Sequence, residues 1–256
     1  MAIDLAKLNS ATKYPSIETY HELGLGGILQ ESGNPFAGWD GPIHVSEKID
    51  GANARIICIE DDWYIGSREE LLTAKGDRVP NPALGIVDTL KDVAPLFTGT
   101  YWYVDVAYVF FVEVYGDRRM PAWKTYGDGT RADFRLFDVA TVDLDILGLD
   151  IEQIAAQRDR GGLQFLERSE WRPVYNVEPV LTETYLLSGE EAPATVDGMH
   201  AFLKGFAQWT HAPIGNIEIP ERGRPEGLVF RTKDRSIIRK ARYQSYERTA
   251  KLRQSQ

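Results

Sequence analysis

The chain has 256 residues, of which 43% are hydrophobic and 26% charged, and its formal net charge is -9. This composition is ordinary for a globular protein that folds by burying apolar side chains. The single cysteine, Cys58, excludes a disulfide framework within the chain and a cysteine-rich zinc site. The sequence shows neither a membrane-length apolar run nor the basic-then-apolar order of a signal peptide. We therefore expect a cytoplasmic protein with no membrane contact.

The negative net charge hides a basic segment near the C-terminus. Between residues 231 and 253 there are nine lysines and arginines but only two acidic residues, so the rest of the chain is strongly acidic. Such a run is compatible with an ordinary solvated face, and equally with a patch that binds an anionic ligand. The sequence leaves both interpretations open.

The predicted elements alternate between strands and a smaller number of helices. Runs rich in valine, isoleucine and aromatic residues predict strands at 41–48, 54–60, 62–67, 102–116, 134–142, 226–232 and 236–242. Helical periodicity predicts helices at 82–97, 151–160 and 197–209, and a basic C-terminal helix at 243–256. The stretches 76–85 and 188–198 are rich in turn residues, but neither gives a firm domain boundary. The sequence thus predicts an α+β fold with a large antiparallel component, organised as a single domain over residues 1–256.

Strand alternation predicts which side chains share a face. In the strand 102–116, Glu113 falls on the face of Phe111, so a carboxylate is displayed from a strand whose other face is packed. In the strand 226–232, Glu226 falls on the face of Leu228 and Phe230. Both glutamates are therefore candidates for chemistry, although an exposed strand residue or a surface ion pair is the alternative for each.

One short motif stands between the first two strands. Lys48 is followed by Asp50, Gly51 and Asn53 in "EKIDGAN". A Lys-x-Asp-Gly string by itself is a weak signal. Its plainest explanation is a hairpin turn that joins the two strands, with the lysine solvated.

Further segments follow this motif in a recognisable order. They are "GSREE" with Arg68, "FFVEVYG" with Glu113, "FRLFDVA" with Phe137 and Asp138, "EGLVF" with Glu226, and Lys240-Ala-Arg242. Together with "EKIDGAN" they resemble the motifs of the ATP-dependent RNA ligase family. That family belongs to the covalent nucleotidyltransferases, which also include DNA ligases and mRNA-capping enzymes. Asn53 favours the RNA ligase branch, whereas Arg242 stands where the family commonly carries lysine.

The resemblance implies both a fold and an activity. The fold would be the antiparallel-sheet nucleotidyltransferase domain of ligase adenylation domains, related to ATP-grasp enzymes. Because few residues follow Arg242, we expect no C-terminal OB-fold. The activity would be the ATP-dependent joining of RNA 5′-phosphate and 3′-hydroxyl ends through a lysyl-AMP intermediate and an adenylylated RNA end.

The resemblance also implies the site residues. The catalytic set would be Lys48, Glu226, Lys240 and Arg242. The nucleotide-binding set would add Glu47, Ile49, Asn53, Arg68, Glu113 and Phe137. Glu113 and Glu226 would hold Mg²⁺ or Mn²⁺, since hard cations prefer carboxylate and phosphate oxygens. Phe137 either stacks on adenine or is simply a buried strand residue, and in an ideal strand Asp138 points to the opposite face.

The residue types suit this chemistry. A lysine must be neutral to attack a phosphate, and free lysine, with a pKa near ~10.4, is mostly protonated at neutral pH. Nearby cations such as Lys240, Arg242 and a bound metal ion disfavour an ammonium group, and they stabilise negative charge on the phosphate oxygens. One cluster of charges would serve both needs.

Two rival functions stay open at this point. One is a DNA ligase or GTP-using capping-type domain that works with a partner, and the other is a non-catalytic RNA-binding relic of the fold. The sequence lacks the glycine-rich Gly-x-x-x-x-Gly-Lys-Ser/Thr loop, which argues against a P-loop ATPase. Any grip on RNA would come from the domain's own surface, with the basic segment after Arg231 as the candidate.

Overall fold

The computed structural model describes residues 3–74, 77–78, 85–98, 105–120, 122–171, 183–215 and 222–254. The chain forms two compact units. Unit 1 consists of Met1–Pro15, Gly51–Trp123 and Gly129–Val180, and unit 2 consists of Ser16–Asp50, Lys124–Asp128 and Leu181–Gln256. Because the chain passes between the units repeatedly, neither unit is one continuous segment. The single domain over 1–256 stays a prediction.

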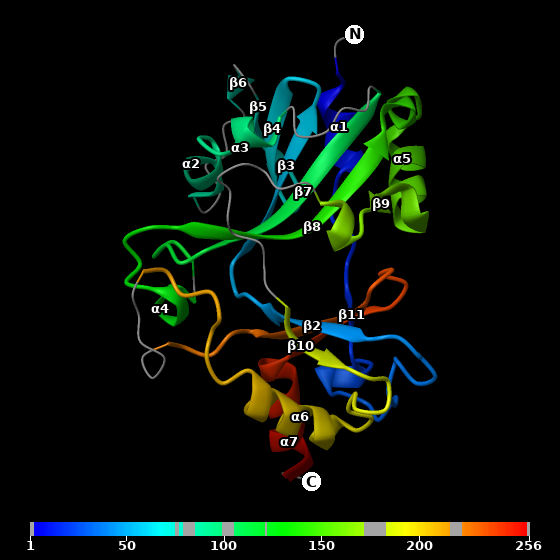
Figure 1. The fold of residues 1–256 in the computed structure, drawn as a ribbon, viewed down its shortest axis with the longest axis vertical. Helices are drawn as coiled ribbons and strands as arrows, with labels where there is room; N and C mark the ends of the chain where they lie inside the picture. Colours follow the sequence, from blue (N-terminus) through cyan, green and yellow to red (C-terminus); the bar gives the residue numbers. More distant parts are fainter. Residues whose placement is uncertain are drawn as a thin grey trace. The chain divides into compact units, whose positions relative to one another are not determined.

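Unit 1 contains a seven-stranded antiparallel sheet in the order β6-β5-β4-β3-β7-β8-β9 (Figure 1). Its strands are β3 (Ala52–Ile59), β4 (Asp62–Ser67), β5 (Leu71–Ala74), β6 (Asp77–Arg78), β7 (Val106–Tyr115), β8 (Asp133–Asp143) and β9 (Gln164–Phe165). Its helices include α1 (Leu5–Ala11), α2 (Ile86–Leu90), α3 (Ala94–Phe97) and α5 (Ile151–Gln157), with short turns η3 (Leu144–Gly148), η4 (Arg158–Gly162) and η5 (Arg168–Glu170). The long β7 and β8 hold this sheet together, since they pair along almost their whole length.

Helices α1 and α5 pack against one face of the unit 1 sheet. Leu8 of α1 and Ile154 of α5 share a buried apolar cluster with Ile57, Val109 and Phe111 of the central strands. The opposite face is buried as well, which explains why the strands read as continuous apolar runs rather than as an alternation.

Unit 2 contains a five-stranded sheet in the order β1-β12-β11-β2-β10. Its strands are β1 (Glu18–Thr19), β2 (Ile43–Lys48), β10 (Glu183–Leu187), β11 (Gly227–Thr232) and β12 (Ile238–Arg242). Its helices are α6 (Val196–Phe206) and α7 (Tyr243–Gln254), with the turn η1 (Leu25–Gly27), and the short α4 (Trp123–Tyr126) begins at the boundary between the units. Only β1 pairs in parallel, with β12, and the other pairings are antiparallel.

Helices α6 and α7 cover one face of the unit 2 sheet, as Figure 1 shows. Val45 and Phe230 point from the sheet into the cluster formed with Met199, Leu203 and Tyr246 of the helices. Because side chains alternate along a strand, residues next to these point to the face that the helices leave uncovered. Burial of the apolar strand residues against the helices thus determines which face of the sheet carries the charged residues.

The strand register aligns the ends of three strands of this sheet. Gly227 of β11 lies opposite both Lys48 of β2 and Arg242 of β12. Val229 in turn lies opposite Lys240. A shift by one residue would move all of these side chains to the helix-covered face, so burial of the apolar residues also fixes the register.

The structure confirms the α+β fold with antiparallel sheets and corrects several details. The hairpin predicted as the plain explanation of "IDGAN" is wrong, since β2 and β3 belong to different sheets. The helix predicted at 82–97 is two short helices, α2 and α3, which residues 91–93 separate. Pro95 lies in the first turn of α3, where a missing amide hydrogen is tolerated. Residues 82–84 and 102–104 lie outside the described residues. Among the residues described, no helix is long and apolar enough to span a membrane.

A substitution at Gly227 would test how closely β11 and β12 approach each other. A Cβ atom there would lie 1.9 Å from the carbonyl oxygen of Ala241 and 2.9 Å from the Cα of Arg242. We expect Gly227→Ala to lower the free energy of unfolding by about 1–3 kcal/mol or more, because the backbone of β12 must move. Urea denaturation would measure the change.

The matched control is Gly205→Ala in α6, where an added Cβ meets nothing within 4 Å. Alanine is the better helix former by up to about 1 kcal/mol, so this variant should be as stable as the wild type or more so. Equal stability of the two variants would contradict the packing argument.

Candidate active site

Lys48, Glu226 and Arg242 meet at the aligned strand ends of unit 2. The Nζ of Lys48 donates a hydrogen bond to Oε2 of Glu226 in a short ion pair. Oε1 of the same carboxylate lies 2.7 Å from Nε of Arg242. The side chains of Lys48 and Glu226 are only 19% and 21% exposed, so water screens this pair less than it screens a surface pair. One carboxylate therefore holds two cations.

Backbone hydrogen bonds fix Glu226 between these two cations. Its amide donates to the carbonyl of Lys48 at 3.1 Å, and its carbonyl accepts from the amide of Tyr243 at 3.0 Å. Glu226 directly precedes β11, so strict alternation does not govern its side chain. Strand alternation had predicted that Glu226 shares the helix-covered face with Leu228. Its carboxylate instead contacts Lys48 and Arg242.

Asp50 adds a second carboxylate to this cluster. Burial raises the pKa of Asp50 above its ordinary value, and the negative charge of Glu226 raises it further. Lys48 and Arg242 act in the opposite direction but do not cancel these effects. The negative charge of Glu226 beside the Asp50 carboxyl group makes this cluster a place where added positive charge is favourable.

Glu47 and Ile49 flank the lysine, but their side chains turn into the protein. Glu47 is 1% exposed and Ile49 is 3% exposed. One carboxylate oxygen of Glu47 accepts from the hydroxyl of Thr210 and the other from the amide of His211, both at 2.6 Å. Sequence reasoning missed Thr210, and no local pattern could have revealed a contact that spans 163 residues.

Asn53 and Glu113 come together in unit 1. They lie directly opposite each other on β3 and β7, and their side chains therefore share a face. Gly51 precedes this pair, and a Cβ there would lie 2.4 Å from the carbonyl oxygen of Val114. A glycine is needed at the entry to β3 because β7 passes so close.

Phe137 occupies a bulge in β8. The register shifts so that Phe111 opposes Asp138 and Val112 opposes Leu136, which leaves Phe137 as the extra residue. Both Phe137 and Asp138 contact Tyr14. The two aromatic rings are 5.2 Å apart, and the Tyr14 hydroxyl donates to Asp138 at 2.7 Å.

The bulge explains why ideal alternation failed for this segment. It brings Asp138 to the side on which Phe137 contacts Tyr14, whereas an ideal strand would separate the two. Phe137 is partly buried against the apolar cluster of unit 1. This packing matches the simpler of its two predicted roles, and its contact with a nucleotide stays a prediction.

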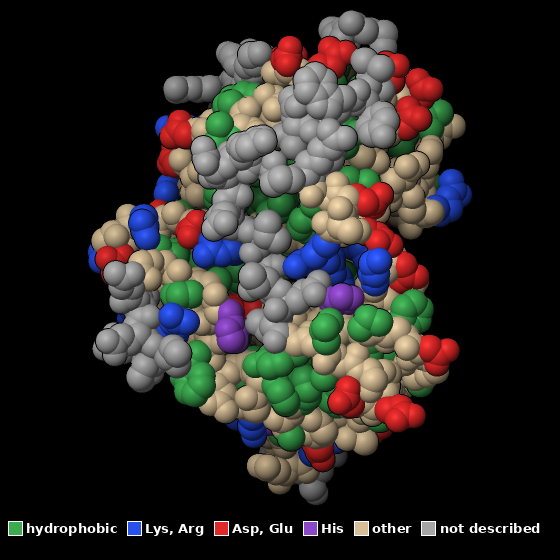
Figure 2. Space-filling view, in the orientation of Figure 1, with side chains coloured by type: hydrophobic (Ala, Val, Ile, Leu, Met, Phe, Trp, Pro, Cys, Tyr) green, Lys and Arg blue, Asp and Glu red, His purple; other side chains and the backbone are tan. Residues whose placement is uncertain are grey.

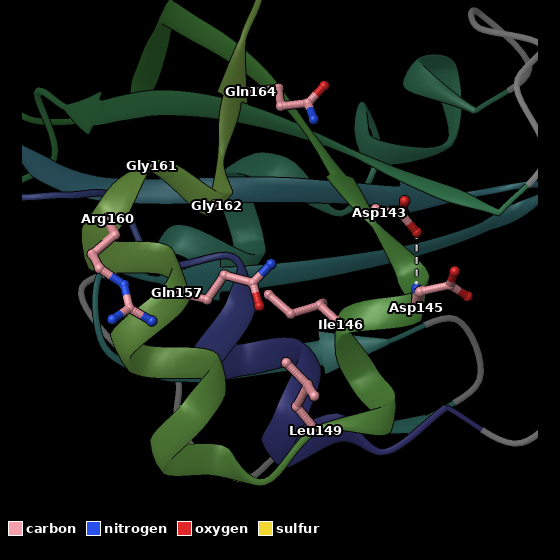
Figure 3. Close-up of a pocket in the computed structure, with 9 residues that line it drawn as sticks. All are labelled: Asp143, Asp145, Ile146, Leu149, Gln157, Arg160, Gly161, Gly162 and Gln164. Atoms are coloured by element: carbon pink, nitrogen blue, oxygen red, sulfur yellow. Dashed lines mark hydrogen bonds between the residues drawn. The ribbon is translucent and has the colours of Figure 1, made fainter.

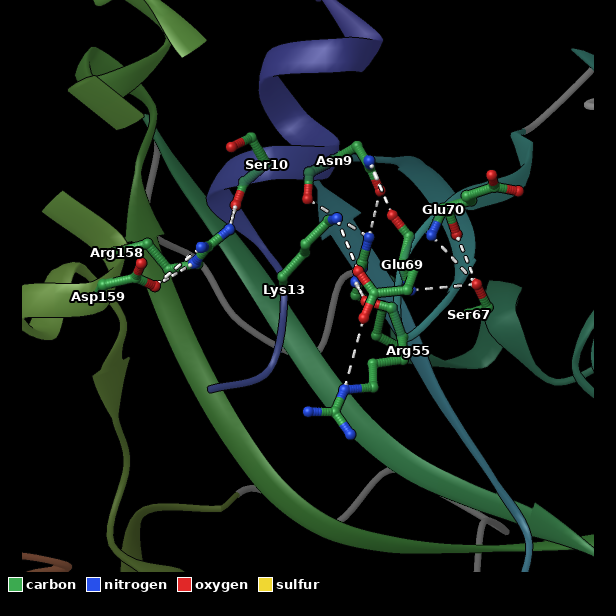
Figure 4. A network of polar contacts seen from close by, with 10 residues as sticks. Asn9, Ser10, Lys13, Arg55, Ser67, Glu69, Glu70, Arg158 and Asp159 are labelled. Atoms are coloured by element: carbon green, nitrogen blue, oxygen red, sulfur yellow. Dashed lines mark hydrogen bonds and ion pairs between the residues drawn. The ribbon is translucent and has the colours of Figure 1, made fainter. Parts of the chain in front are cut away.

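Arg68 lies in a turn whose backbone accepts a hydrogen bond from a buried arginine, Arg55. Figure 4 shows Arg55 together with Ser67 and Glu69, the neighbours of Arg68 in the sequence. Arg55 of β3 is 1% exposed, and its guanidinium donates to the carbonyl of Arg68 at 3.0 Å and to the Asn9 side chain. Burial lowers the pKa of Arg55 to about 10. Arg68 itself makes a looser ion pair with Glu69, at 3.6 Å. Sequence reasoning did not single out Arg55, which secures the turn rather than displaying a charge.

Several arginines of the basic segment, residues 231–253, form ion pairs with acidic side chains. Arg239, Arg242 and Arg253 each form an ion pair, with Glu18, Glu226 and Glu31 respectively. Acidic side chains occur at many places on the face shown in Figure 2, in keeping with the net charge of -9. A role for this segment in RNA binding stays a prediction.

A pocket in unit 1 involves different residues. This cavity has a volume of about 620 Å³ and is lined by η3, the end of α5, η4 and β9. Figure 3 shows its lining residues. Asp143, Asp145 and Arg160 are among its lining residues, and none of the predicted site residues is. The described residues contain no cluster of three or more metal-binding side chains.

Comparison with known proteins identifies the family. The family model described as RNA ligase matches residues 41–252, so the chain belongs to the RNA ligase family. No curated protein matches the sequence.

Solved structures of an RNA ligase from Naegleria gruberi are similar at low identity. The form with PPi is 16% identical with a TM-score of 0.48, and the match covers 93% of this chain and 64% of that one. A mutant with ATP and Mn is 15% identical with a TM-score of 0.46, over 94% and 63% of the two chains. This chain thus spans less than two thirds of the length of those ligases.

Asp50 makes the stability of this cluster depend on pH. Because its pKa in the folded protein is raised above the ordinary 3.8, the folded state keeps this proton to higher pH than the unfolded state does. As the pH rises from below 3.8 through the raised pKa, the wild type should lose stability relative to Asp50→Asn. Melting curves of both proteins across this range would measure the difference, from which other titrations cancel. A difference that is flat or grows in the opposite direction would contradict the assignment.

Proposed function

We propose that this protein is an ATP-dependent RNA ligase that uses Lys48 as its nucleophile. The observation that supports the proposal is the meeting of Lys48, Glu226 and Arg242 at the aligned ends of β2, β11 and β12. The carboxylate holds the Lys48 amine in place beside a guanidinium, and that guanidinium can stabilise negative charge on a phosphate that the amine attacks. Membership of the RNA ligase family supports the same activity.

In the first step, the Lys48 ammonium group releases a proton to solvent, and its neutral Nζ then attacks the α-phosphorus of ATP and loses a second proton to solvent as the N–P bond forms. The bond from this phosphorus to the pyrophosphate oxygen breaks, and a lysyl-AMP phosphoramidate forms. Glu226 aims the amine before the reaction because its backbone and its carboxylate are both fixed. Arg242 and Lys240 stabilise the negative charge that grows on the phosphate oxygens.

The proposal includes a divalent metal ion, Mg²⁺ or Mn²⁺. The residues fit it, because the carboxyl groups of Glu226 and Asp50 lie in one cluster and supply the hard oxygen atoms that such ions prefer. When bound, the ion would supply charge neutralisation at the phosphates. Glu226 would hold it, and Glu113 stays the second predicted ligand.

The later steps transfer AMP and join the strands. A 5′-phosphate oxygen of RNA attacks the α-phosphorus, the bond to Lys48 breaks, and an adenylylated RNA end forms. A 3′-hydroxyl then attacks the 5′-phosphorus, and AMP leaves as the phosphodiester bond forms. Asn53, Arg68, Glu113 and Phe137 are the proposed nucleotide contacts from unit 1.

Replacing the nucleophile tests the proposal directly. Incubation of the wild type with ATP and Mg²⁺ should add one AMP moiety to the protein, detectable by intact mass spectrometry. Lys48→Ala should abolish this product because no other group can replace the attacking amine. Circular dichroism would show that the variant is folded.

The control for this experiment is Lys7→Ala. Lys7 is also a partly buried lysine, and its Nζ donates to the carbonyl of Leu147 in unit 1. This variant should become adenylylated like the wild type. Adenylylation of Lys48→Ala would refute the nucleophile assignment.

Replacing the carboxylate tests its part in the first step. Glu226→Gln keeps the size of the side chain but removes the charge that holds Lys48 and Arg242. We expect the rate of lysyl-AMP formation to fall by about 100- to 1,000-fold, the usual loss when one preorganised electrostatic contact is removed. Single-turnover measurement at saturating ATP would give the rate, and an unchanged rate would exclude the proposed role.

The substrate is tested with nucleotides and strands. ATP should support adenylylation and GTP should not, and strands with a 5′-phosphate should be joined whereas those with a 5′-hydroxyl should not. Preference for nicked DNA over RNA, or for GTP, would replace the proposal with a DNA ligase or a capping-type enzyme. Nucleotide binding without adenylylation would favour the non-catalytic relic.

A further inference from the structure

The segment that carries Lys48 is held on its N-terminal side by a buried carboxylate. Both oxygens of Glu47 accept hydrogen bonds, from the Thr210 hydroxyl and from the His211 amide, at 2.6 Å each. The Thr210 hydroxyl oxygen also accepts from the amide of Ala212 at 3.0 Å. Thr210 is 1% exposed, so water does not compete for these contacts. The residue before the lysine is therefore fixed to the segment that follows α6.

The same segment is held on its C-terminal side by a buried tyrosine. The amide of Asp50, two residues after Lys48, donates to the hydroxyl oxygen of Tyr126 at 2.6 Å. The Tyr126 side chain is completely buried. Because β2 ends at Lys48 and β3 begins at Ala52, strand pairing does not fix the backbone of residues 49–51, and this hydrogen bond fixes it at Asp50 instead.

The two supports are joined to each other. The amide of Ile214 donates to the carbonyl of Tyr126 at 2.6 Å. Gly223 accepts from the amide of Thr210 at 2.9 Å and donates to the carbonyl of Thr125 at 3.1 Å. An added Cβ at Gly223 would lie 2.6 Å from the Cα of Thr125, so the two segments are in close contact. Gly223 also lies three residues before Glu226, which carries the carboxylate that holds the lysine.

We propose that Tyr126 and Thr210 are positioning residues that fix the backbone on both sides of Lys48 and so set the direction from which its amine attacks. This inference rests on the proposed function of Lys48. Neither side chain is assigned a contact with ATP, and both act through the backbone or the neighbour of the nucleophile. Glu47 acts here through its buried carboxylate, which is a role different from its predicted contact with the nucleotide.

The geometry explains why a hydroxyl is needed at position 126. Phenylalanine would keep the buried ring but leave the amide of Asp50 without the oxygen that now accepts its hydrogen bond. The backbone after Lys48 would then gain freedom at the point where β2 has ended. A displacement of about 1 Å in a reacting group costs on the order of 100-fold in rate, whereas binding of ATP by other contacts is unaffected.

The test compares the rate of lysyl-AMP formation in the wild type and in Tyr126→Phe by single-turnover kinetics. We expect the maximal rate of the variant to fall by about 10- to 100-fold while the ATP concentration for half-maximal rate stays unchanged. Hydrogen exchange at the amide of Asp50 should become faster in the variant, and exchange within β2 should not change.

The matched control is Tyr246→Phe. Tyr246 is also a buried tyrosine of unit 2, and its hydroxyl forms a hydrogen bond with Nδ1 of His21 at 2.8 Å on the helix-covered side of the sheet. This variant also loses a buried hydroxyl group and should lose stability, but it should keep the maximal rate. A rate loss in Tyr246→Phe as large as in Tyr126→Phe would reduce the effect to general stability and overturn the inference.

The second support is tested at Thr210. Thr210→Val keeps the shape but removes the hydroxyl that Glu47 needs, and Thr210→Ser keeps it. Thr210→Val should therefore be slow and Thr210→Ser should be close to the wild type. This pair decides the matter even if Tyr126→Phe does not fold.

The outcomes separate the inference from the function on which it rests. If the wild type forms lysyl-AMP and Tyr126→Phe and Thr210→Val are as fast, the inference fails and the proposed function stands. If the wild type forms no lysyl-AMP, the proposed function fails and the inference fails with it. The inference would also be overturned if the variants kept the maximal rate but needed a higher ATP concentration for half-maximal rate. That pattern indicates a role in binding ATP.

Discussion

The carboxylate of Glu226 is the interaction on which the candidate site depends. One oxygen accepts a hydrogen bond from Lys48, and the other contacts Arg242. The negative charge therefore offsets the repulsion between two cations that lie on either side of β11. The arrangement is partly shielded from water, which strengthens the attraction. It also keeps the proposed nucleophile together with Arg242, which we propose stabilises the phosphate charge. Removal of the carboxylate would leave like charges side by side.

The apolar side of the same sheet makes this arrangement possible. Val45 and Phe230 anchor their strands against α6 and α7, and the alternation of side chains then presents Lys48, Lys240 and Arg242 to the other face. The absence of a side chain at Gly227 lets β12 approach β11 closely enough for Arg242 to reach Glu226. Core packing and site geometry are thus two consequences of one register, and a stable core variant that shifts the register would lose the site.

In unit 1, strand pairing and a bulge place the predicted site residues. Asn53 and Glu113 are brought together by direct pairing of β3 and β7, whereas Phe137 and Asp138 depend on a bulge in β8. Two polar contacts link the N-terminal segment to the sheet of this unit. Arg55 donates to the side chain of Asn9 in α1, and Tyr14, which follows α1, donates to Asp138. These supports are hydrogen-bonded, so the buried polar groups do not carry the full cost of desolvation.

The sequence by itself determined the α+β class and the main long strands, because apolar patterning is a local property. An ordered set of short motifs, which is also local, predicted the residues that we propose carry the chemistry. Only the tertiary structure decided that "IDGAN" connects two sheets, that Glu226 leaves the alternation of β11 to reach Lys48, and that Asp138 joins Phe137 at Tyr14. It alone revealed Tyr126 and Thr210. Their contacts span 76 and 163 residues, and the pairing of such distant groups is set by packing, which no local pattern records.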